Sequence, residues 1–330
     1  GLFVRRGVLP GWRQLAGPAL LSPGPVGAWQ ALRLGYYGEW LPNTFYAKVS
    51  GGSAVLWRGL DYVRDGLVET PMLPLSLGVL LALGGLRRPL GGLAALVTAF
   101  HLAYVVKVGG DYMPVGRFLV PVLPLLAAAW VTAVAPRRAL AAATGLVAVL
   151  FGLLPYATLH LHREHDEHLA RYARAALWLD AYAPPDALIA SFAIGVIGYV
   201  AKRPILDTQG LVDREVARFR PENWDLSGPA GHDRADPSYV LGRKPDLVLL
   251  GNVWIRPVPM TPESLAANTQ LLSGTDRFLF GMPAFFDAYD IVNWQLDGGD
   301  WIGLAVRLDC PLHPDHPDFV GPPAGPRFER

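Results

Sequence analysis

The 330-residue sequence contains a single cysteine, Cys310. One cysteine excludes a disulfide within the chain and a zinc site built from several thiolates. Charged residues are also scarce, at 17% against roughly 25% in typical soluble domains. The formal net charge is only +1, and no block of lysine and arginine stands among aromatic residues. The sequence therefore carries no electrostatic signature of nucleic-acid binding, and we expect no nucleic acid as a partner.

Several catalytic signatures are absent as well. The sequence has no GxSxG, HExxH, Walker or GxGxxG pattern. Hydrolase, zinc-protease, nucleotide-triphosphatase and dinucleotide-binding functions are therefore unsupported. The first residues also lack the ordered regions of a signal peptide, and the chain starts at Gly1 rather than methionine. We expect the chain to be a fragment that lacks upstream sequence.

Hydrophobic residues are abundant instead, at 52% of the chain, and the mean hydropathy is +0.27. A stretch at 15–35 is long enough to span a bilayer but holds several prolines and glycines, so we expect a weak or re-entrant span there. We predict that residues 1–160 form a transmembrane region. Four firmer spans have bilayer length and hydrophobicity, at 70–86, 90–107, 117–135 and 139–159.

The positions of the arginines indicate how the chain is oriented. Short loops rich in lysine and arginine stay in the cytoplasm, and the arginine pairs at 87–88 and 137–138 each lie between two expected spans. On this rule, residues 36–69 and 108–116 are outer loops, and everything after residue 160 lies outside. We therefore expect a multi-pass protein of the cytoplasmic (inner) membrane, with the lipid bilayer as a partner and an extracytoplasmic C-terminal domain.

After residue 160 the pattern changes to that of a water-soluble α/β domain, which we place at 161–310. A charged run with apolar residues at helical spacing opens it, and AIGVIGYVA at 193–201 predicts a short helix. The segment 311–330 is a Pro-rich tail that we expect to be extended or disordered. Strand-like runs separated by Gly/Pro-rich turns lie at 187–191, 245–250, 288–293 and 301–308. The predicted fold class is an α-helical polytopic membrane region followed by an α/β extracytoplasmic domain.

The first polar cluster, YYGEWLPNTFYAKVSGG, occupies residues 36–52. The side chains of Asn43 and Thr44 could hydrogen-bond sugar hydroxyls, and Lys48 offers a point charge for a phosphate. The alternative is an interfacial belt of aromatic residues with a lysine that extends to the water.

The second cluster, GGDYMPVGR, occupies residues 109–117. Its two glycines permit a tight turn that brings the backbone close to a ligand. Asp111, held at the membrane surface beside Arg117, could act as a base, a metal ligand or an acceptor for a sugar hydroxyl. The alternative is a structural ion pair between Asp111 and Arg117 that closes the loop.

The third cluster lies in the α/β domain, in RPILDTQGLVDREVA at 203–217 and GHD at 231–233. Asp207 follows a strand-like run, where ligand-binding residues of α/β sheets tend to lie. Asp213 and His232 could complete a polar pocket. Alternatively, Asp213 is a helix cap and His232 a hydrogen-bonded structural residue.

A row of histidines suggests a metal, but the charged residues among them favour a solvated helix. We therefore predict no metal site and no cofactor, while a divalent cation remains compatible with the chemistry. The histidines are His160, His162, His165 and His168.

Taken in order, three motif groups resemble bacterial GT-C-type membrane glycosyltransferases. These motifs are YYGEWLPNTFYAK, then GGDYMPVGRFLVPVLPLL, then IGVIGYVAKRPILDTQGLVD with GHD and RKPDLVLL. The resemblance covers about residues 30–310 and is strongest to the terminal arabinofuranosyltransferases of actinobacterial cell walls. It implies transfer of a sugar from a polyprenyl-phosphate-linked donor to a glycan acceptor of the cell envelope, outside the cytoplasmic membrane.

The resemblance also implies roles for residues in the outer segments. Enzymes of this kind usually carry their catalytic acidic residue in the first outer loop, a region that this chain lacks, so the fragment alone need not be active. Asp111 is our candidate catalytic residue, and with Lys48 it would help to form the site for the donor phosphate and sugar. Residues expected to shape or complete the substrate site are Tyr36, Tyr37, Asn43, Thr44, Arg117, Asp207, Asp213 and His232.

The alternative from another class is a non-enzymatic envelope protein whose outer α/β domain binds a glycan or a protein partner. A transporter is disfavoured because the expected spans hold few charged residues.

Overall fold

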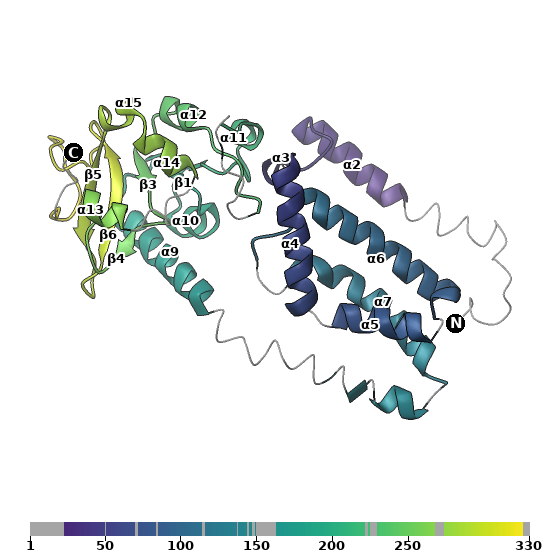
Figure 1. The fold of residues 1–330 in the computed structure, drawn as a ribbon. Helices are drawn as coiled ribbons and strands as arrows, with labels where there is room; N and C mark the ends of the chain where they lie inside the picture. The colour runs from purple at the N-terminus through teal and green to yellow at the C-terminus, as the bar shows by residue number, and fades with distance from the viewer. Residues whose placement is uncertain are drawn as a thin grey trace.

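The structure, a computed structural model, has an N-terminal helical part and a C-terminal part in which helices surround a mixed sheet (Figure 1). The span expected at 15–35 is described only from residue 23, and most of the one expected at 139–159 lies outside the described residues. The structure describes residues 23–325 except 50, 70–71, 84, 114–115, 137, 144, 147–148, 150–162, 222–223, 225–229 and 268–273.

The helical part consists of α2 (Pro23–Tyr37), α3 (Asn43–Lys48), α4 (Ser53–Glu69), α5 (Met72–Ala82), α6 (Pro89–Val108) and α7 (Leu123–Val134), with 3-10 turns η1 (Gly85–Arg87) and η2 (Arg117–Val122). Much of the segment 36–69, expected as an outer loop, is therefore helical. Helix α4 packs closely on α6, because a Cβ atom at Gly59 would lie only 2.4 Å from the backbone oxygen of Val106. Apolar residues of α5, α6, η2 and α7 share one buried core.

Among the described residues, two helical segments are long and apolar enough to cross a membrane. They are Pro89–Val108, with mean hydropathy 1.7, and Arg117–Val134, with mean hydropathy 1.8. A third span results if Ser53–Val68 and Leu73–Ala82, which meet at a bend of 76°, are counted as one. Large apolar side chains on α6, including those of Leu93 and Phe100, are exposed in the structure, as expected of a surface that faces lipid.

These segments match two of the expected spans and revise a third. The predictions at 90–107 and 117–135 coincide with helices of suitable length and composition. The prediction at 70–86 does not give a spanning helix on its own, because α5 has only 11 residues. A helix of that length covers about 16 Å, roughly half of a bilayer's hydrocarbon core.

The C-terminal part contains α9 (Arg163–Tyr182), β1 (Ile189–Ser191), α10 (Ile194–Ala201), β2 (Ile205–Asp207), α11 (Arg214–Arg218), α12 (Pro237–Gly242), β3 (Leu247–Leu249), β4 (Ile255–Arg256), α13 (Pro262–Ala266), α14 (Gly274–Phe280), α15 (Pro283–Phe286), β5 (Tyr289–Gln295) and β6 (Trp301–Arg307). The strand order is β2-β1-β3-β6-β4, with β5 on the other edge of β6. Strands β1, β2 and β3 are parallel, whereas β6 is antiparallel to β3, β4 and β5. The four strands and the helix predicted at 193–201 are confirmed, and the strand-like run expected before Asp207 forms β2. Strand β4 was not predicted.

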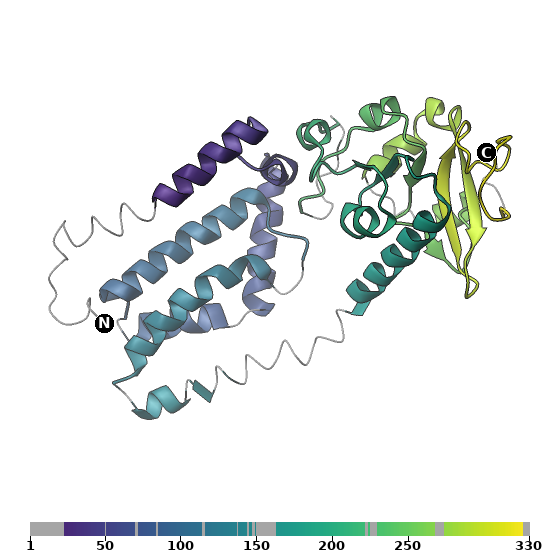
Figure 2. The ribbon, with the colours of Figure 1, turned by 180° about the vertical axis from the view of Figure 1, so that it is seen from behind.

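The sheet separates two apolar cores because its side chains alternate between its faces. Leu247 and Leu249 of β3 pack with residues of α9 and α10 on one face. Val248 packs with residues of α12, α13, α14 and α15 on the other. Figure 2 shows α9 running from the side of the helical part up to the sheet.

The Pro-rich tail differs from the expectation of an extended or disordered segment. Its described part, up to residue 325, folds back onto β5, where Gly325 N donates to Asn293 O at 2.7 Å and Trp294 Nε1 donates to Pro322 O at 3.1 Å. Leu312 is fully buried. The apolar residues among the prolines therefore give this segment a core contact that composition alone does not reveal.

Candidate functional site

A pocket of about 240 Å³ lies where the helical part meets the α/β domain, and we call it the junction pocket. It brings together residues from all three polar clusters: Thr44 and Lys48 from the first, Asp111 from the second, and Gly231 from the third. Its complete lining is Pro42, Thr44, Phe45, Lys48, Val49, Tyr104, Val108, Gly110, Asp111, Phe118, Ala230 and Gly231.

The junction pocket lies at one end of both candidate spans. Val108 is the last residue of the first span, and Phe118 is the second residue of the other. A bilayer crossed by these helices would therefore end close to the pocket. The pocket would face the boundary between lipid and water.

Asp111 forms an ion pair on the wall of the pocket. Its Oδ2 lies 2.5 Å from Nη2 of Arg117, and its side chain is only 4% exposed, whereas that of Arg117 is 48% exposed. The contact is electrostatic rather than a well-aligned hydrogen bond, because the same Oδ2 has no donor in hydrogen-bonding geometry. The structure thus contains the loop-closing pair, and it leaves the carboxylate with unused capacity to accept a hydrogen bond.

The two glycines before Asp111 serve the packing of the helices. Gly109 ends α6 in the left-handed conformation with φ 82°, and Gly110 has φ 75°. A Cβ atom on Gly110 would lie 2.5 Å from Cβ of Tyr62. The close approach that the sequence predicts here is therefore to α4, and it fixes where Asp111 leaves the helix.

Lys48 is the last residue of α3, and its aliphatic chain covers Gly231, where a Cβ atom would lie 3.3 Å from Cγ of Lys48. Within the described part of the chain, Lys48 forms no salt bridge. The pocket therefore has an uncompensated ammonium group on one side and a carboxylate on another.

His232 lies beside the pocket rather than in its lining. Its ring packs edge-on against Tyr112, with centroids 4.8 Å apart, and its Nδ1 lies 3.3 Å from the backbone oxygen of Ala230. Burial lowers the pKa of His232, nearby Lys48 lowers it further, and Asp111 and other groups oppose the shift. The structural role considered from the sequence agrees with these contacts.

Asp207 and Asp213 bind backbone groups of their own domain. The carboxylate of Asp207 is buried and accepts N–H donors from Gln209 at 2.9 Å, Gly210 at 3.1 Å and Val212 at 2.7 Å. Burial raises the pKa of Asp207, and these donors oppose the shift. Asp213 caps α11, as one alternative from the sequence proposed. Neither residue lines the junction pocket.

Asn43 ties the two parts of the protein together. Its Nδ2 donates to the backbone oxygens of Gly210 at 2.8 Å and Asp213 at 3.0 Å. The loop that Asp207 and Asp213 stabilise is therefore the surface that receives Asn43. Asn43, Asp207 and Asp213 were predicted to contact substrate, but in the structure they stabilise the contact between the two parts of the protein.

Tyr36 and Tyr37 lie at the end of α2 and are 83% and 63% exposed. Their rings pack edge to face, with centroids 4.6 Å apart, and neither ring lines the junction pocket. The interfacial aromatic belt considered from the sequence stays a prediction.

A buried ion pair crosses the junction at a residue that no pattern in the sequence singles out. Arg58 of α4 forms a two-pronged ion pair with Asp233, with Nη1–Oδ1 3.0 Å and Nη2–Oδ2 2.8 Å. The Asp233 side chain is 1% exposed and that of Arg58 15%. Asp233 stands in the GHD motif, but nothing in the sequence identifies Arg58 as its partner.

Other charged residues extend these contacts along α3 and the turn before it. Glu39 pairs with Arg214 at 2.8 Å and with Arg218 at 2.7 Å. Arg234 donates to two backbone oxygens at and after α3, at 3.2 Å and 3.0 Å. Glu39 lies inside the first motif and Arg214 inside the third, whereas Arg218 and Arg234 directly follow motif residues. This closeness to the motifs was the available signal in the sequence.

The part of the chain that the structure describes contains no cluster of potential metal ligands. No group of three or more histidine, cysteine, aspartate or glutamate side chains there could hold an ion. His160 and His162 lie outside the described residues.

Comparisons with known proteins match parts of the chain. The family described as "Domain of unknown function (DUF8728)" matches residues 157–300. The chain is also similar to the Terminal beta-(1->2)-arabinofuranosyltransferase of Corynebacterium glutamicum, with 36% identity over 137 residues, covering 36% of this chain and 20% of that protein. No solved structure matches the chain. The chain therefore aligns with about one fifth of the length of this curated relative.

Proposed function

We propose that this chain is the C-terminal part of a membrane glycosyltransferase of the GT-C type. In this proposal it moves a sugar from a polyprenyl-phosphate donor to a glycan acceptor of the cell envelope, on the outer face of the cytoplasmic membrane. The similarity to an arabinofuranosyltransferase supports a related transferase activity. The observation that carries the proposal is the junction pocket, which places Lys48 and Asp111 at the ends of two candidate spans.

The position of the pocket suits a donor that is anchored in lipid. Such a donor keeps its hydrocarbon tail in the bilayer and presents its phosphosugar at the surface. The pocket's 240 Å³ is below the roughly 300–1,000 Å³ of sites for drug-sized ligands. It is therefore sized for the head of the donor, while the tail remains among the apolar side chains of α6.

The two charged groups have complementary roles in such a transfer. Negative charge develops on the departing phosphate, and the unpaired ammonium of Lys48 would stabilise it. Asp111 would accept a hydrogen bond from a sugar hydroxyl or take the proton of the acceptor hydroxyl as that oxygen bonds to the sugar. Arg117 holds the Asp111 carboxylate in place from the exposed side of the loop.

An activity assay of the full-length gene product in detergent tests this proposal. It measures the rate of sugar transfer from polyprenyl-phosphate sugars, with an arabinofuranosyl donor as the first substrate. We expect Asp111→Asn and Lys48→Met each to lower the rate by about 10²-fold or more, the usual contribution of one general base or one charge-stabilising donor. Asp65→Asn is the matched control, because Asp65 is exposed on α4 and forms only a surface pair with Arg64.

Two results would contradict the proposal. Wild-type rates in both variants would remove Asp111 and Lys48 from the site. Glycan binding by the wild-type protein without transfer from any polyprenyl-phosphate sugar would favour the non-enzymatic envelope protein.

A further inference from the structure

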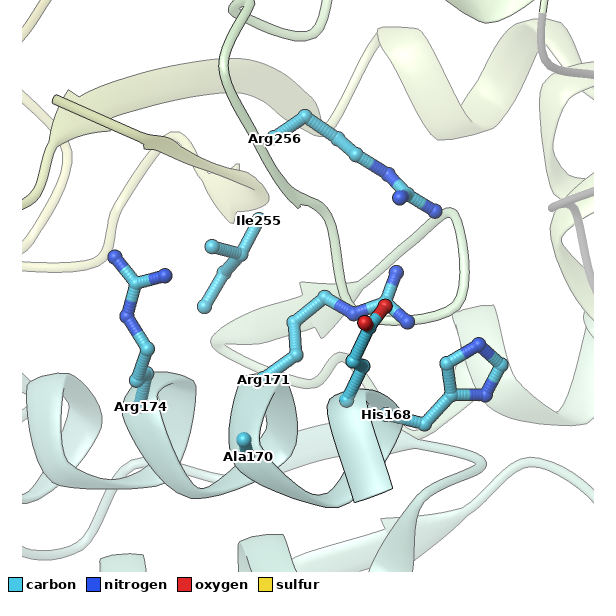
Figure 3. Close-up of a pocket in the computed structure, with 7 residues that line it drawn as sticks. His168, Ala170, Arg171, Arg174, Ile255 and Arg256 are labelled. Atoms are coloured by element: carbon cyan, nitrogen blue, oxygen red, sulfur yellow. The ribbon is translucent and has the colours of Figure 1, made fainter. Parts of the chain in front are cut away.

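A second pocket, of about 370 Å³, lies between α9 and β4 in the α/β domain, and we call it the arginine pocket (Figure 3). It shares no residue with the junction pocket, and the proposed transfer does not use it. Three arginines contribute to it, two from α9 and one from β4. They are Arg171, Arg174 and Arg256.

Two of these arginines have buried nitrogen atoms with no hydrogen-bond partner among the described residues. Arg171 is only 9% exposed, and its Nη1 has no hydrogen-bond partner. The Nε of Arg256 is buried and likewise has none. Neither residue forms a salt bridge with any described residue. Unpaired buried donors of a charged group are costly, so an uncompensated pair of guanidinium groups requires a reason.

The remaining charges around the pocket do not neutralise this pair. Arg174 is already paired with Asp300, at 2.6 Å. Glu167 is exposed on the rim, and its charge acts on Arg171 without a salt bridge between them. Burial lowers the pKa of Arg171, and the charge of Arg256 lowers it further. Arg171 nevertheless keeps its positive charge, because a guanidinium group is effectively always protonated in proteins.

The two guanidinium groups reach into the pocket from different elements, Arg171 from α9 and Arg256 from β4 (Figure 3). Each is a planar group with several N–H donors that match the oxygens of a phosphate. His168 stands at the same end of α9 and could add a donor. An oxyanion held by the accessible N–H groups of the two arginines would compensate their buried charge and cancel their repulsion.

We propose that Arg171 and Arg256 form a binding site for a phosphate group on the α/β domain. Arg171 lies about 12 Å along α9 from the first residue of that helix. The phosphate could come from a soluble phosphorylated sugar or from a lipid headgroup, since both present the same oxygens.

The test measures binding of inorganic phosphate to the full chain in detergent, by calorimetry and by thermal unfolding at constant ionic strength, with chloride as the reference anion. We expect phosphate to bind and to raise the unfolding temperature of the wild type. Arg171→Met and Arg256→Gln should each weaken binding at least tenfold, and Glu167→Gln should tighten it. Lys202→Gln is the matched control, because it removes one exposed cation from the same domain.

A purely structural arginine would behave differently. If Arg171 only supported the fold, Arg171→Met would lower the unfolding temperature in chloride. In the proposed site it should raise that temperature, because it removes an unpaired buried charge beside Arg256. If Arg171→Met does not fold, Arg256→Gln is the test of the site. Unchanged phosphate affinity in Arg256→Gln would overturn the proposal.

Two further arms distinguish the sources of the phosphate. Displacement of inorganic phosphate by ribose 5-phosphate in detergent would support a soluble ligand. The second arm compares amide hydrogen exchange at residues 167–174 in phosphatidylglycerol and phosphatidylcholine nanodiscs. Slower exchange in phosphatidylglycerol would support an anionic headgroup, provided that Arg256→Gln abolishes the difference. No binding of inorganic phosphate, and no effect in either arm, would refute the site.

Discussion

The ion pair between Arg58 and Asp233 should control how firmly the α/β domain docks on the helical part. Replacing Arg58 with methionine keeps most of the apolar chain but leaves the 1%-exposed carboxylate of Asp233 without its cation. Removing one partner of a buried pair typically costs about 3–5 kcal/mol. Because the Arg58 side chain retains 15% exposure, we expect the lower end, about 3 kcal/mol, which is a factor of roughly 10² in the docking equilibrium.

Amide hydrogen exchange at residues 230–236 is the appropriate assay, because a protein with two parts need not unfold in one step. Exchange in this loop should be about a hundredfold faster in Arg58→Met, while amides in the sheet, such as those of β3, should be unchanged. Arg64→Met is the control on the same helix, since Arg64 pairs with Asp61 and Asp65 only at the surface.

A double variant tests the physical reason for the effect. Arg58→Met combined with Asp233→Leu removes both charges, so slow exchange should largely return. Unchanged exchange in Arg58→Met, or a double variant that exchanges as fast as the single one, would refute the reasoning.

Two further predictions concern the junction. Gly110→Ala should lower the unfolding temperature more than Gly38→Ala. Both glycines have positive φ, but only at Gly110 would a Cβ atom meet another residue, at 2.5 Å from Cβ of Tyr62. Equal losses of unfolding temperature in the two variants would contradict this. Because burial lowers the pKa of His232, the unfolded state binds its proton first as the pH falls, so stability should decrease below about pH 6.5. His232→Gln should reduce that slope in unfolding temperatures measured from pH 8 to pH 5, and an identical slope in the variant would argue against it.

Elements with strong local patterns were predictable from the sequence. The strand-like runs that became β1, β3, β5 and β6 stand between turn residues, and two apolar spans have unmistakable length. Strand β4 has only two residues and is too short to show a period, whereas the strand-like run before Asp207 became β2. Their place in the sheet depends on neighbours that are distant in sequence.

The site was predictable as a meeting of motifs but not in its details. The sequence indicated that the segments around Lys48, Asp111 and His232 belong together. It could not show that Asn43 donates to backbone oxygens more than 160 residues away, because such a contact depends on how two folded parts dock. The arginine pocket was hidden for the same reason. The opening of α9 has the composition of a solvated helix, and only the fold brings Arg256 against it.

The lone thiol of Cys310 offers a practical advantage for mapping the membrane topology. It is fully buried, and burial raises its pKa, so the reactive thiolate is scarce and shielded. A cysteine introduced at an exposed position, such as Tyr199 in the α/β domain or Val26 in α2, would thus be the accessible nucleophile among these 330 residues. Membrane-impermeant maleimides applied to intact cells would then report the side of the bilayer on which each marked segment resides, without prior removal of native thiols.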